Sequence, residues 1–438
     1  QAKTLFPYTT LFRSGIMSKK VYLNSLWMMA EKLLSIFGLI FVTSFVARYI
    51  GPANFGKLTF ATSIFAIVQT VSLFGSDNLI FQKTSQNRKT GEHIIFATRT
   101  LRNLFFAVFA SLVLLYLYLT VDPLTFIFSV AACIGVYFSL HDTAYSIYFN
   151  ATLQSRFNTI CNVTAILVSL IVRYGIAEFH LPVSYLSIPI VLVTLVPFLM
   201  RRAIFARKKL SNPERIAERL QQYRGYVLKV GRKLVLYTLS IAIFTKTSQL
   251  FLGIKSQHDL GIYSVAMTLG SSFYFVLNAF ISSFLTQIYA EKDFDRSQNM
   301  VARLNLMVIV IASSAAVFFA LFGHWIIQWL YGAAYQQVND ILIIAVFVTL
   351  FSGMSTVAEK YLIKFNAYDY LHHKTMILVV FNVVVTFLAI HYFALYGAIF
   401  AILATEILSL TLFNYFYKQG LILTFYLTLL SSFPSVTS

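Results

Sequence analysis

Charged residues are scarce in this chain. Only 11% of its 438 residues are Asp, Glu, Lys or Arg, whereas a soluble globular domain carries about 25%. A surface so poor in charge cannot face water on all sides, and 58% of the residues are hydrophobic. This composition excludes an ordinary soluble domain, and the long apolar runs predict membrane-spanning segments.

Cysteines and acidic residues are also few. The two cysteines, Cys133 and Cys161, lie inside apolar runs, so we expect no disulfide framework and no metal site. The 34 Lys and Arg residues outnumber the 16 Asp and Glu residues and give a formal net charge of +18, which would suit nucleic acid. The basic residues lie between the apolar runs, however, and this excludes nucleic acid as a partner. No nucleotide-binding signature is present, and we expect no cofactor.

The apolar runs are long enough for about twelve spanning helices, because a helix needs roughly 20 apolar residues to cross about 30 Å of hydrocarbon. They lack the alternation of barrel strands. The expected fold class is an all-α polytopic membrane protein. Spans are expected near 23–46, 57–76, 101–119, 124–141, 158–174 and 184–200, and then near 235–253, 261–288, 304–323, 341–363, 375–393 and 397–416.

The positions of Lys and Arg predict the orientation. Most of them fall on one set of alternate connections, and the richest of these runs from Arg201 to Lys233. Because basic loops stay in the cytoplasm, the N-terminus and this segment are expected there, in contact with anionic membrane lipids. The stretch from Asn212 to Arg224 is predicted to form a short amphipathic surface helix.

The same basic segment divides the chain into two sets of six spans. The expected organisation is a non-native leader at 1–16, which resembles translated adapter sequence, and then an N-terminal bundle at 17–200. A cytoplasmic linker at 201–233 leads to a C-terminal bundle at 234–418. Residues 419–438 form a tail, and whether it is truncated is left open.

A faint internal repeat relates the two halves. The segment from Phe55 to Ala61 aligns with the segment from Leu260 to Ala266, and each opens the second span of its half. Parallel repeats of this kind occur in transporters, with the substrate path between the halves. The expected architecture is therefore two six-helix bundles related as parallel pseudo-repeats.

The segment GPANFGKL, from Gly51 to Leu58, nearly spells a phosphate-binding P-loop. That motif requires Ser or Thr where Leu58 stands, and it follows a strand rather than a spanning helix. We interpret the segment as a tight turn. Gly51 and Pro52 end one helix, and Gly56 allows the next helix to begin close by.

This turn also carries a resemblance to a known family. Residues 47–58, ARYIGPANFGKL, resemble the signature ARYLGPxxFGxL of polysaccharide transport proteins in the multidrug/oligosaccharidyl-lipid/polysaccharide (MOP) exporter superfamily. The second-half segment LGIYSVA, which contains Gly261, is similar to the family's xGxYxxA motif. The resemblance extends from Met17 to about Lys418 and is strongest to O-antigen flippases of the Wzx type.

The resemblance implies a central cavity between the bundles that opens alternately to either side of the bacterial inner membrane. It implies that an undecaprenyl-diphosphate-linked oligosaccharide moves from the cytoplasmic to the periplasmic leaflet, driven by a coupled ion. The implied protein partners are the polysaccharide polymerase and the chain-length machinery of O-antigen and lipopolysaccharide synthesis.

Lys246 is the deepest cation of the predicted spans. It lies about 13 residues beyond Lys233, roughly 20 Å along a helix, so it cannot easily reach the near interface. Ionisable groups inside spans are functional candidates. Lys246 either faces the substrate diphosphate from the cavity or pairs with a carboxylate, and Gln249 shares its helix face.

Two carboxylates are candidates for ion coupling. Glu31 lies in the first span beside Lys32, which either lines the cavity as a second cation or extends to the cytoplasmic interface. Glu406 lies near the middle of the last span, where the alternative is a protonated carboxyl bonded to a neighbour. Arg48 and Asp77 lie at span ends, as gate or structural residues.

Other functions stay open from the residues alone. A multidrug or lipid II exporter of the same superfamily would share these features. A membrane polymerase or ligase needs acids or bases on a sizeable outer loop, and the longest outer loop, from Gly323 to Asp340, offers only His324 and Asp340. We therefore expect a transporter rather than an enzyme.

Overall fold

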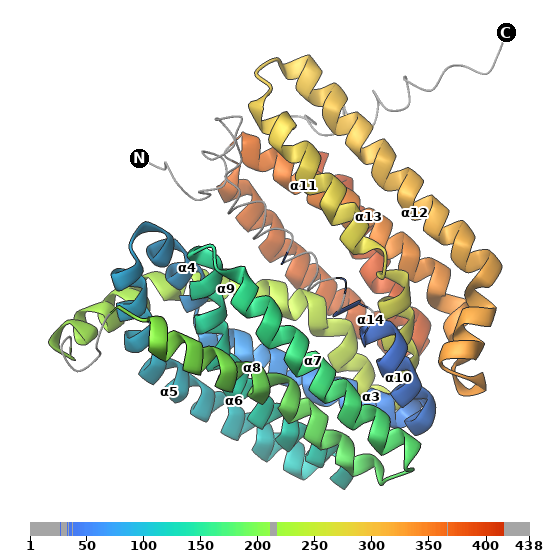
Figure 1. The fold of residues 1–438 in the computed structure, drawn as a ribbon. Helices are drawn as coiled ribbons and strands as arrows, with labels where there is room; N and C mark the ends of the chain where they lie inside the picture. Colours follow the sequence, from blue (N-terminus) through green and yellow to red (C-terminus); the bar gives the residue numbers. More distant parts are fainter. Residues whose placement is uncertain are drawn as a thin grey trace. The chain divides into compact units, whose positions relative to one another are not determined.

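The computed structural model describes Trp27, Leu33, residues 35–36, 38–210, 217–365 and 367–415. Within these residues the regular structure is helical throughout, with short π and 3-10 segments, and no strand occurs (Figure 1). The predicted all-helical fold class is confirmed.

The chain divides into two compact units, Met17–Gly253 and Ile254–Ser438. The boundary falls after Gly253, so most of the helix that carries the seventh predicted span is counted with the first unit. The first unit contains η1 (Gly38–Val42), α3 (Thr43–Leu73), α4 (Ser76–Gln86), α5 (Arg88–Thr120), α6 (Pro123–Ala151), α7 (Ser155–Glu178), η2 (Val183–Leu186), α8 (Ser187–Lys208) and most of α9 (Ala217–Lys255).

The second unit contains the remaining helices. They are α10 (Gln257–Gly270), α11 (Tyr274–Ala290), α12 (Phe294–Leu330), η4 (Ala333–Tyr335), α13 (Val338–Lys364), α14 (Tyr368–Leu410) and α15 (Leu412–Tyr415). Each predicted span coincides with one or more helices of the two units. For the first predicted span, the structure describes a continuous stretch only from Gly38 onward.

Eight helices of the described residues are long and apolar enough to cross a membrane. Two of them each carry two predicted spans. In α3 the helix breaks at Gly51 (φ 76°, ψ 168°), a conformation that glycine adopts without steric cost. In α14 it breaks at Ala394 (φ 48°, ψ −119°).

The two arms of α14 run back along each other. Asn382 Nδ2 donates to Thr405 Oγ1 at 3.2 Å, and Lys374 Nζ, farther from the break, donates to Asn414 Oδ1 of α15 at 2.8 Å. Asn382 and Thr405 both lie near the break, whereas Lys374 and Asn414 both lie farther from it. The pairing is that of an antiparallel helical hairpin, and it accounts for two spans within one assigned helix.

Capping residues determine where several helices begin. Asn87 accepts hydrogen bonds from the first-turn amides of α5, and Asp122 accepts one from Thr125 N at the start of α6, where Pro123 takes the first position. Asp293 caps α12 in the same way. Such side chains satisfy helix-end donors that have no partner within the helix.

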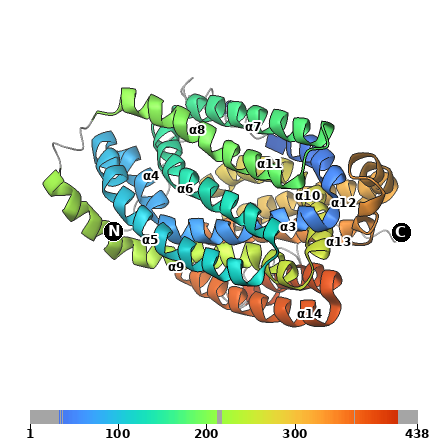
Figure 2. The ribbon, with the colours of Figure 1, turned by 90° about the horizontal axis from the view of Figure 1, so that it is seen from below.

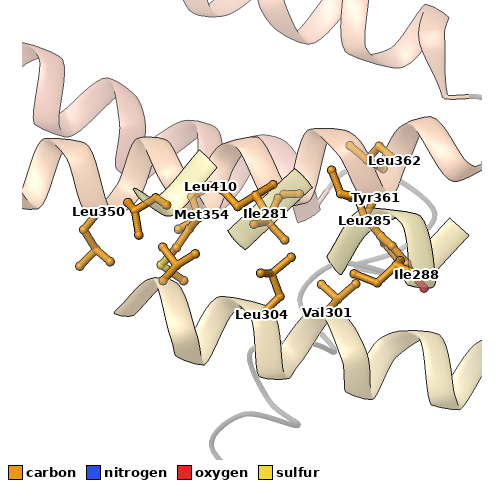
Figure 3. Close-up of a cluster of buried hydrophobic side chains, with 14 of the residues drawn as sticks. Ile281, Leu285, Ile288, Val301, Leu304, Leu350, Met354, Tyr361, Leu362 and Leu410 are labelled. Atoms are coloured by element: carbon orange, nitrogen blue, oxygen red, sulfur yellow. The ribbon is translucent and has the colours of Figure 1, made fainter. Parts of the chain in front are cut away.

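Each unit has a packed apolar interior. In the first unit α6 lies against α3 and α8, and α8 also lies against α7 (Figure 2). In the second unit, apolar side chains of α11, α12, α13 and α14 interdigitate (Figure 3). Because lipid is as apolar as these side chains, packing contacts rather than transfer from water hold such interiors together. The labelled members are Ile281, Leu285, Ile288, Val301, Leu304, Leu350, Met354, Tyr361, Leu362 and Leu410.

Candidate functional site

A break between α3 and α4 shapes the candidate site. Phe74 (φ 49°) and Gly75 (φ 68°) both adopt left-handed backbone conformations, which is uncommon for a residue other than glycine. The Phe74 ring stacks on Phe105 with ring centroids 4.8 Å apart. Ser76 then starts a new helix, and the break places Asp77 in its first turn.

Helix α9 packs along α3 on the same side as this break. Gly253 lies against the Phe60 ring, and Gly231 lies against the carbonyl oxygen of Phe74. Between these two points Ser63 Oγ donates to Gln249 Oε1 at 2.7 Å. Three contacts, spread over more than twenty residues of α9, align this helix with α3 and its break.

A cavity of about 340 Å³ lies between these helices within the first unit. It holds two of the residues singled out from the sequence, Lys246 on α9 and Asp77 on α4. The rest of its lining is small, hydroxylated or aliphatic, and consists of Ala66, Thr70, Leu73, Thr238, Ile241, Ala242 and Thr245. The lining is thus mostly apolar, and its few polar groups include one cation and one carboxylate that could orient a charged ligand.

Lys246 is oriented by a neutral partner. Its Nζ donates to Gln249 Oε1 at 3.0 Å, and the same oxygen accepts the hydrogen bond from Ser63. Lys246 lines the cavity, and its role toward an anionic substrate stays a prediction. Among the described residues no carboxylate lies within 4.0 Å of its ammonium group.

Asp77 provides the opposite charge in the same cavity. It lies beyond the candidate span that ends at Leu73, and burial raises the pKa of its carboxyl above the ordinary value, although backbone hydrogen bonds partly offset this. No salt bridge joins Asp77 to Lys246 within the part of the chain that the structure describes. The net charge of the cavity therefore depends on whether Asp77 is protonated.

The remaining sequence candidates of the first half lie elsewhere. Arg48 is exposed on α3, shortly before the break at Gly51. Pro52 follows that break and is buried, as is Gly56, which lies one turn later inside the resumed helix. Lys32 and Glu31 lie outside the described residues. Their proposed roles stay predictions.

Glu406 belongs to a cluster of charges in the second unit. It is 8% exposed and lies on the second arm of α14. Its carboxyl interacts electrostatically with Glu359 of α13 and Lys374 of α14. Lys360 also interacts electrostatically with Glu359. Gly261 of the second-half motif is buried in α10, away from this cluster in sequence.

The sequence did not reveal a second buried charge network. Arg201, counted from the sequence as the first residue of the linker, lies inside α8 and is only 2% exposed. Its guanidinium group forms an ion pair with Asp142 of α6 and donates to Asn162 Oδ1 of α7. The only sequence signal for this network was Asp142, which directly follows the fourth predicted span.

A metal site is not formed by the residues described. Among them no group of three or more His, Cys, Asp or Glu side chains is positioned to hold a metal ion. The two cysteines are unpaired, with Cys161 buried and Cys133 partly buried.

A model of the polysaccharide biosynthesis protein family matches residues 45–340, which is more than half of the chain. The chain belongs to this family. The match covers the turn motif, the cavity of the first unit and the start of the second unit, and it confirms the polysaccharide branch that the motif predicted. No curated protein matches this member of the family by sequence.

Solved structures of transporters share its fold. Lipid II flippase MurJ, in an inward closed conformation, has a TM-score of 0.68 at 12% identity over 94% of this chain and 93% of that one. An inward-facing MATE multidrug transporter of the MOP superfamily gives 0.65 at 13% identity, over 94% and 99%. The eukaryotic MATE transporter AtDTX14 gives 0.55 at 11% identity, over 94% and 98%. The fold of this polysaccharide biosynthesis protein is that of MOP exporters, as predicted.

Proposed function

We propose that this protein is a flippase for undecaprenyl-diphosphate-linked oligosaccharides, which it moves from the cytoplasmic to the periplasmic leaflet by alternating access. The family match points to polysaccharide biosynthesis, and the fold is shared with transporters. The observation that carries the proposal is the cavity that holds Lys246 beside hydroxyl groups, with no carboxylate paired to it among the described residues.

The proposed substrate explains why such a cavity is needed. A glycan and a diphosphate would lose their hydration in bare hydrocarbon, at a cost of many kcal/mol. The cation in the cavity offsets the diphosphate charge. The hydroxyls of Thr70, Thr238 and Thr245 donate to carbonyls of their own helices, and their oxygens can accept hydrogen bonds from sugar hydroxyls. The polyprenyl tail can stay in lipid throughout, so the protein needs to shelter only the head group.

The proposed setting follows from the same reasoning. The protein would lie in the bacterial inner membrane with its N-terminus and basic connections in the cytoplasm. Its product would supply the polymerase and chain-length machinery that assemble O-antigen or a similar surface polysaccharide.

Removing the cavity cation tests the proposal. We expect Lys246→Gln to lower flipping of an undecaprenyl-diphosphate-linked oligosaccharide in proteoliposomes by about tenfold or more, because it deletes a charge-assisted contact to the diphosphate. Lys229→Gln is the matched control, since Lys229 is an exposed lysine on the same helix, outside the cavity. Equal flipping by Lys246→Gln and wild type, at equal protein abundance, would refute the role of Lys246.

Lipid II export is the second candidate, because the lipid II flippase shares the fold with a TM-score of 0.68. Its substrate has the same diphosphate-polyprenyl part, so Lys246 alone does not distinguish the two. Competition in one proteoliposome assay does: we expect an O-antigen-type repeat unit to inhibit its own transport at lower concentration than lipid II does. The reverse order would favour lipid II, and inhibition by organic cations alone would favour multidrug export.

Ion coupling is proposed to reside at Glu406. Its ionised form is costly in a buried position, so uptake of a proton or cation there biases the unit between two states. We expect Glu406→Gln, which keeps the shape but cannot titrate, to abolish the response of flipping to an imposed ion gradient. A residual downhill flipping activity should remain. A gradient response equal to that of wild type would exclude Glu406 as the coupling group.

A further inference from the structure

A second cluster of cations lies at one end of the α7–α8 pair, outside the cavity. The Arg156 guanidinium carbon lies 4.8 Å from the centroid of the Phe157 ring, and Lys208 Nζ lies 4.5 Å from the same centroid. Both cations are exposed. Two residues separated by more than fifty positions therefore place their charges on one aromatic ring.

The cluster continues along the end of α8. Arg202 lies over the Phe198 ring at 5.9 Å, and Lys209 lies over the Phe96 ring at 5.7 Å. Cation–π contacts hold these side chains in place without neutralising them. Within the part of the chain that the structure describes, no carboxylate lies within 4.0 Å of any of these four cations.

An apolar stripe extends from this cluster along α7. Ile160, Leu167 and Ile171 are 47%, 53% and 70% exposed. Their spacing of seven and four residues places them on one helix face. Arg156 lies on the same face, one turn before Ile160. From Arg156 to Leu167 is about 16 Å along the helix, close to the depth of one hydrocarbon leaflet of a bilayer. A lipid whose phosphate contacts Arg156 could therefore lay one acyl chain along this stripe.

The geometry points to a binding site for an anionic phospholipid at Arg156 and Lys208, with the phosphate between the two cations and an acyl chain along α7. The two cations match the charge of the headgroup, and the stripe distinguishes a lipid from a free phosphate ion, which would gain nothing from it. The site lies at the end of the bundle that the basic loops predict to be cytoplasmic. It is independent of the proposed flippase function.

Lipid binding to the purified full chain in detergent micelles tests the site. The probes are dioleoyl phosphatidylglycerol, dioleoyl phosphatidylcholine and inorganic phosphate, and the readout is lipid occupancy by native mass spectrometry, with thermal unfolding as a second readout. We expect Arg156→Gln/Lys208→Gln to weaken phosphatidylglycerol binding about thirtyfold and each single variant to weaken it about fivefold.

The matched control is Lys292→Gln/Arg296→Gln, which removes two exposed cations that no described aromatic ring holds; we expect its binding to equal that of wild type. An equal loss in both double variants would overturn the proposal, because binding would then follow net charge alone. Phosphatidylcholine binding as strong as phosphatidylglycerol binding would overturn it too. Inorganic phosphate that stabilises the protein as well as the lipid does would reassign the site to a free anion.

Discussion

The ion pair of Arg201 and Asp142 shows how much a single buried charge depends on its partner. Both groups lie between α6, α7 and α8, and Asn162 provides a further acceptor for the guanidinium. Removing one member leaves the other charge buried and uncompensated, which typically costs about 3–5 kcal/mol. We expect Asp142→Asn and Arg201→Met each to lower the free energy of unfolding in detergent by that amount.

The double variant Asp142→Leu/Arg201→Met should recover most of this loss, because an apolar pair of similar volume carries no desolvation cost. Lys57 and Asp122 form the matched control, since they pair at 2.8 Å in a partly exposed position. Burial raises the pKa of Asp122, but hydrogen bonds from Lys57 and Thr125 outweigh this and lower it below the ordinary value. Asp122→Asn should cost no more than about 1 kcal/mol. If Asp142→Leu/Arg201→Met lost as much stability as the two single variants of Asp142 and Arg201 lose together, this account would be contradicted.

At the residue scale the sequence predicted those groups whose position in a span is itself unusual. Lys246 was identifiable because a lysine in the middle of an apolar run has no interface within reach. Asp142 was not identified, because it directly follows a predicted span and its partner Arg201 is 59 positions away. No sequence pattern indicated that Asp77 and Lys246 line one cavity, since this depends on the packing of α9 against α3.

At the scale of elements, apolar runs predicted the helices well, and breaks only in part. Gly51 and Pro52 identify one break through their own chemistry. Phe74 and Ala394 adopt positive φ values that neither residue favours, so residue type did not reveal these breaks. At Phe74 the stacking on Phe105 and the contact with Gly231 accompany the break. The end of α8 at Lys208 rather than near residue 200 follows from Arg201, whose buried partner lets the helix continue past the apolar run.

Two glycines of α9 test whether this helix supports the break. A methyl group added at Gly231 would lie 2.6 Å from the carbonyl oxygen of Phe74, whereas one at Gly225 would meet nothing within 4 Å. We expect Gly225→Ala to stabilise the protein by about 0.5–1 kcal/mol through helix propensity. Gly231→Ala should destabilise it by about 1–3 kcal/mol through overpacking.

Thermal or denaturant unfolding of the two variants in the same detergent measures the difference. The two positions share one helix and are six residues apart, so the intrinsic preference for alanine is the same for both. Equal stabilisation by both substitutions would show that α9 does not press on the break at Phe74.

At the scale of the whole molecule, the chain's composition and its proposed task have the same physical basis. Hydrocarbon solvates the exposed apolar faces, such as Ile171 on α7 and Trp329 on α12, which are about 70% exposed. Two interior places of the first unit that hold charged groups differ in their charge balance. The pair of Arg201 and Asp142 is internally neutralised, whereas Lys246 and Asp77 face one cavity without pairing.

That unpaired arrangement predicts how ligand binding depends on pH. Because burial raises the pKa of Asp77, this carboxyl takes up a proton at a higher pH than an ordinary aspartate does. Below that pKa the cavity carries the positive charge of Lys246 alone, and above it the carboxylate offsets that charge. Diphosphate affinity should therefore increase as the pH falls through the pKa of Asp77 and decrease as the pH rises through it.

A short polyprenyl diphosphate such as farnesyl diphosphate, titrated into the purified protein by calorimetry at several pH values, measures this effect. We expect Asp77→Asn to bind it about fivefold more tightly at neutral pH, which corresponds to roughly 1 kcal/mol for one repulsive charge removed. The variant should lose the part of the pH dependence that comes from Asp77 and keep the part that wild type shares, which comes from ionisation of the ligand and of Lys246. If wild type and Asp77→Asn have parallel pH profiles, the carboxylate does not share its cavity with the diphosphate, and Lys246 must then recognise its anion without opposition from Asp77.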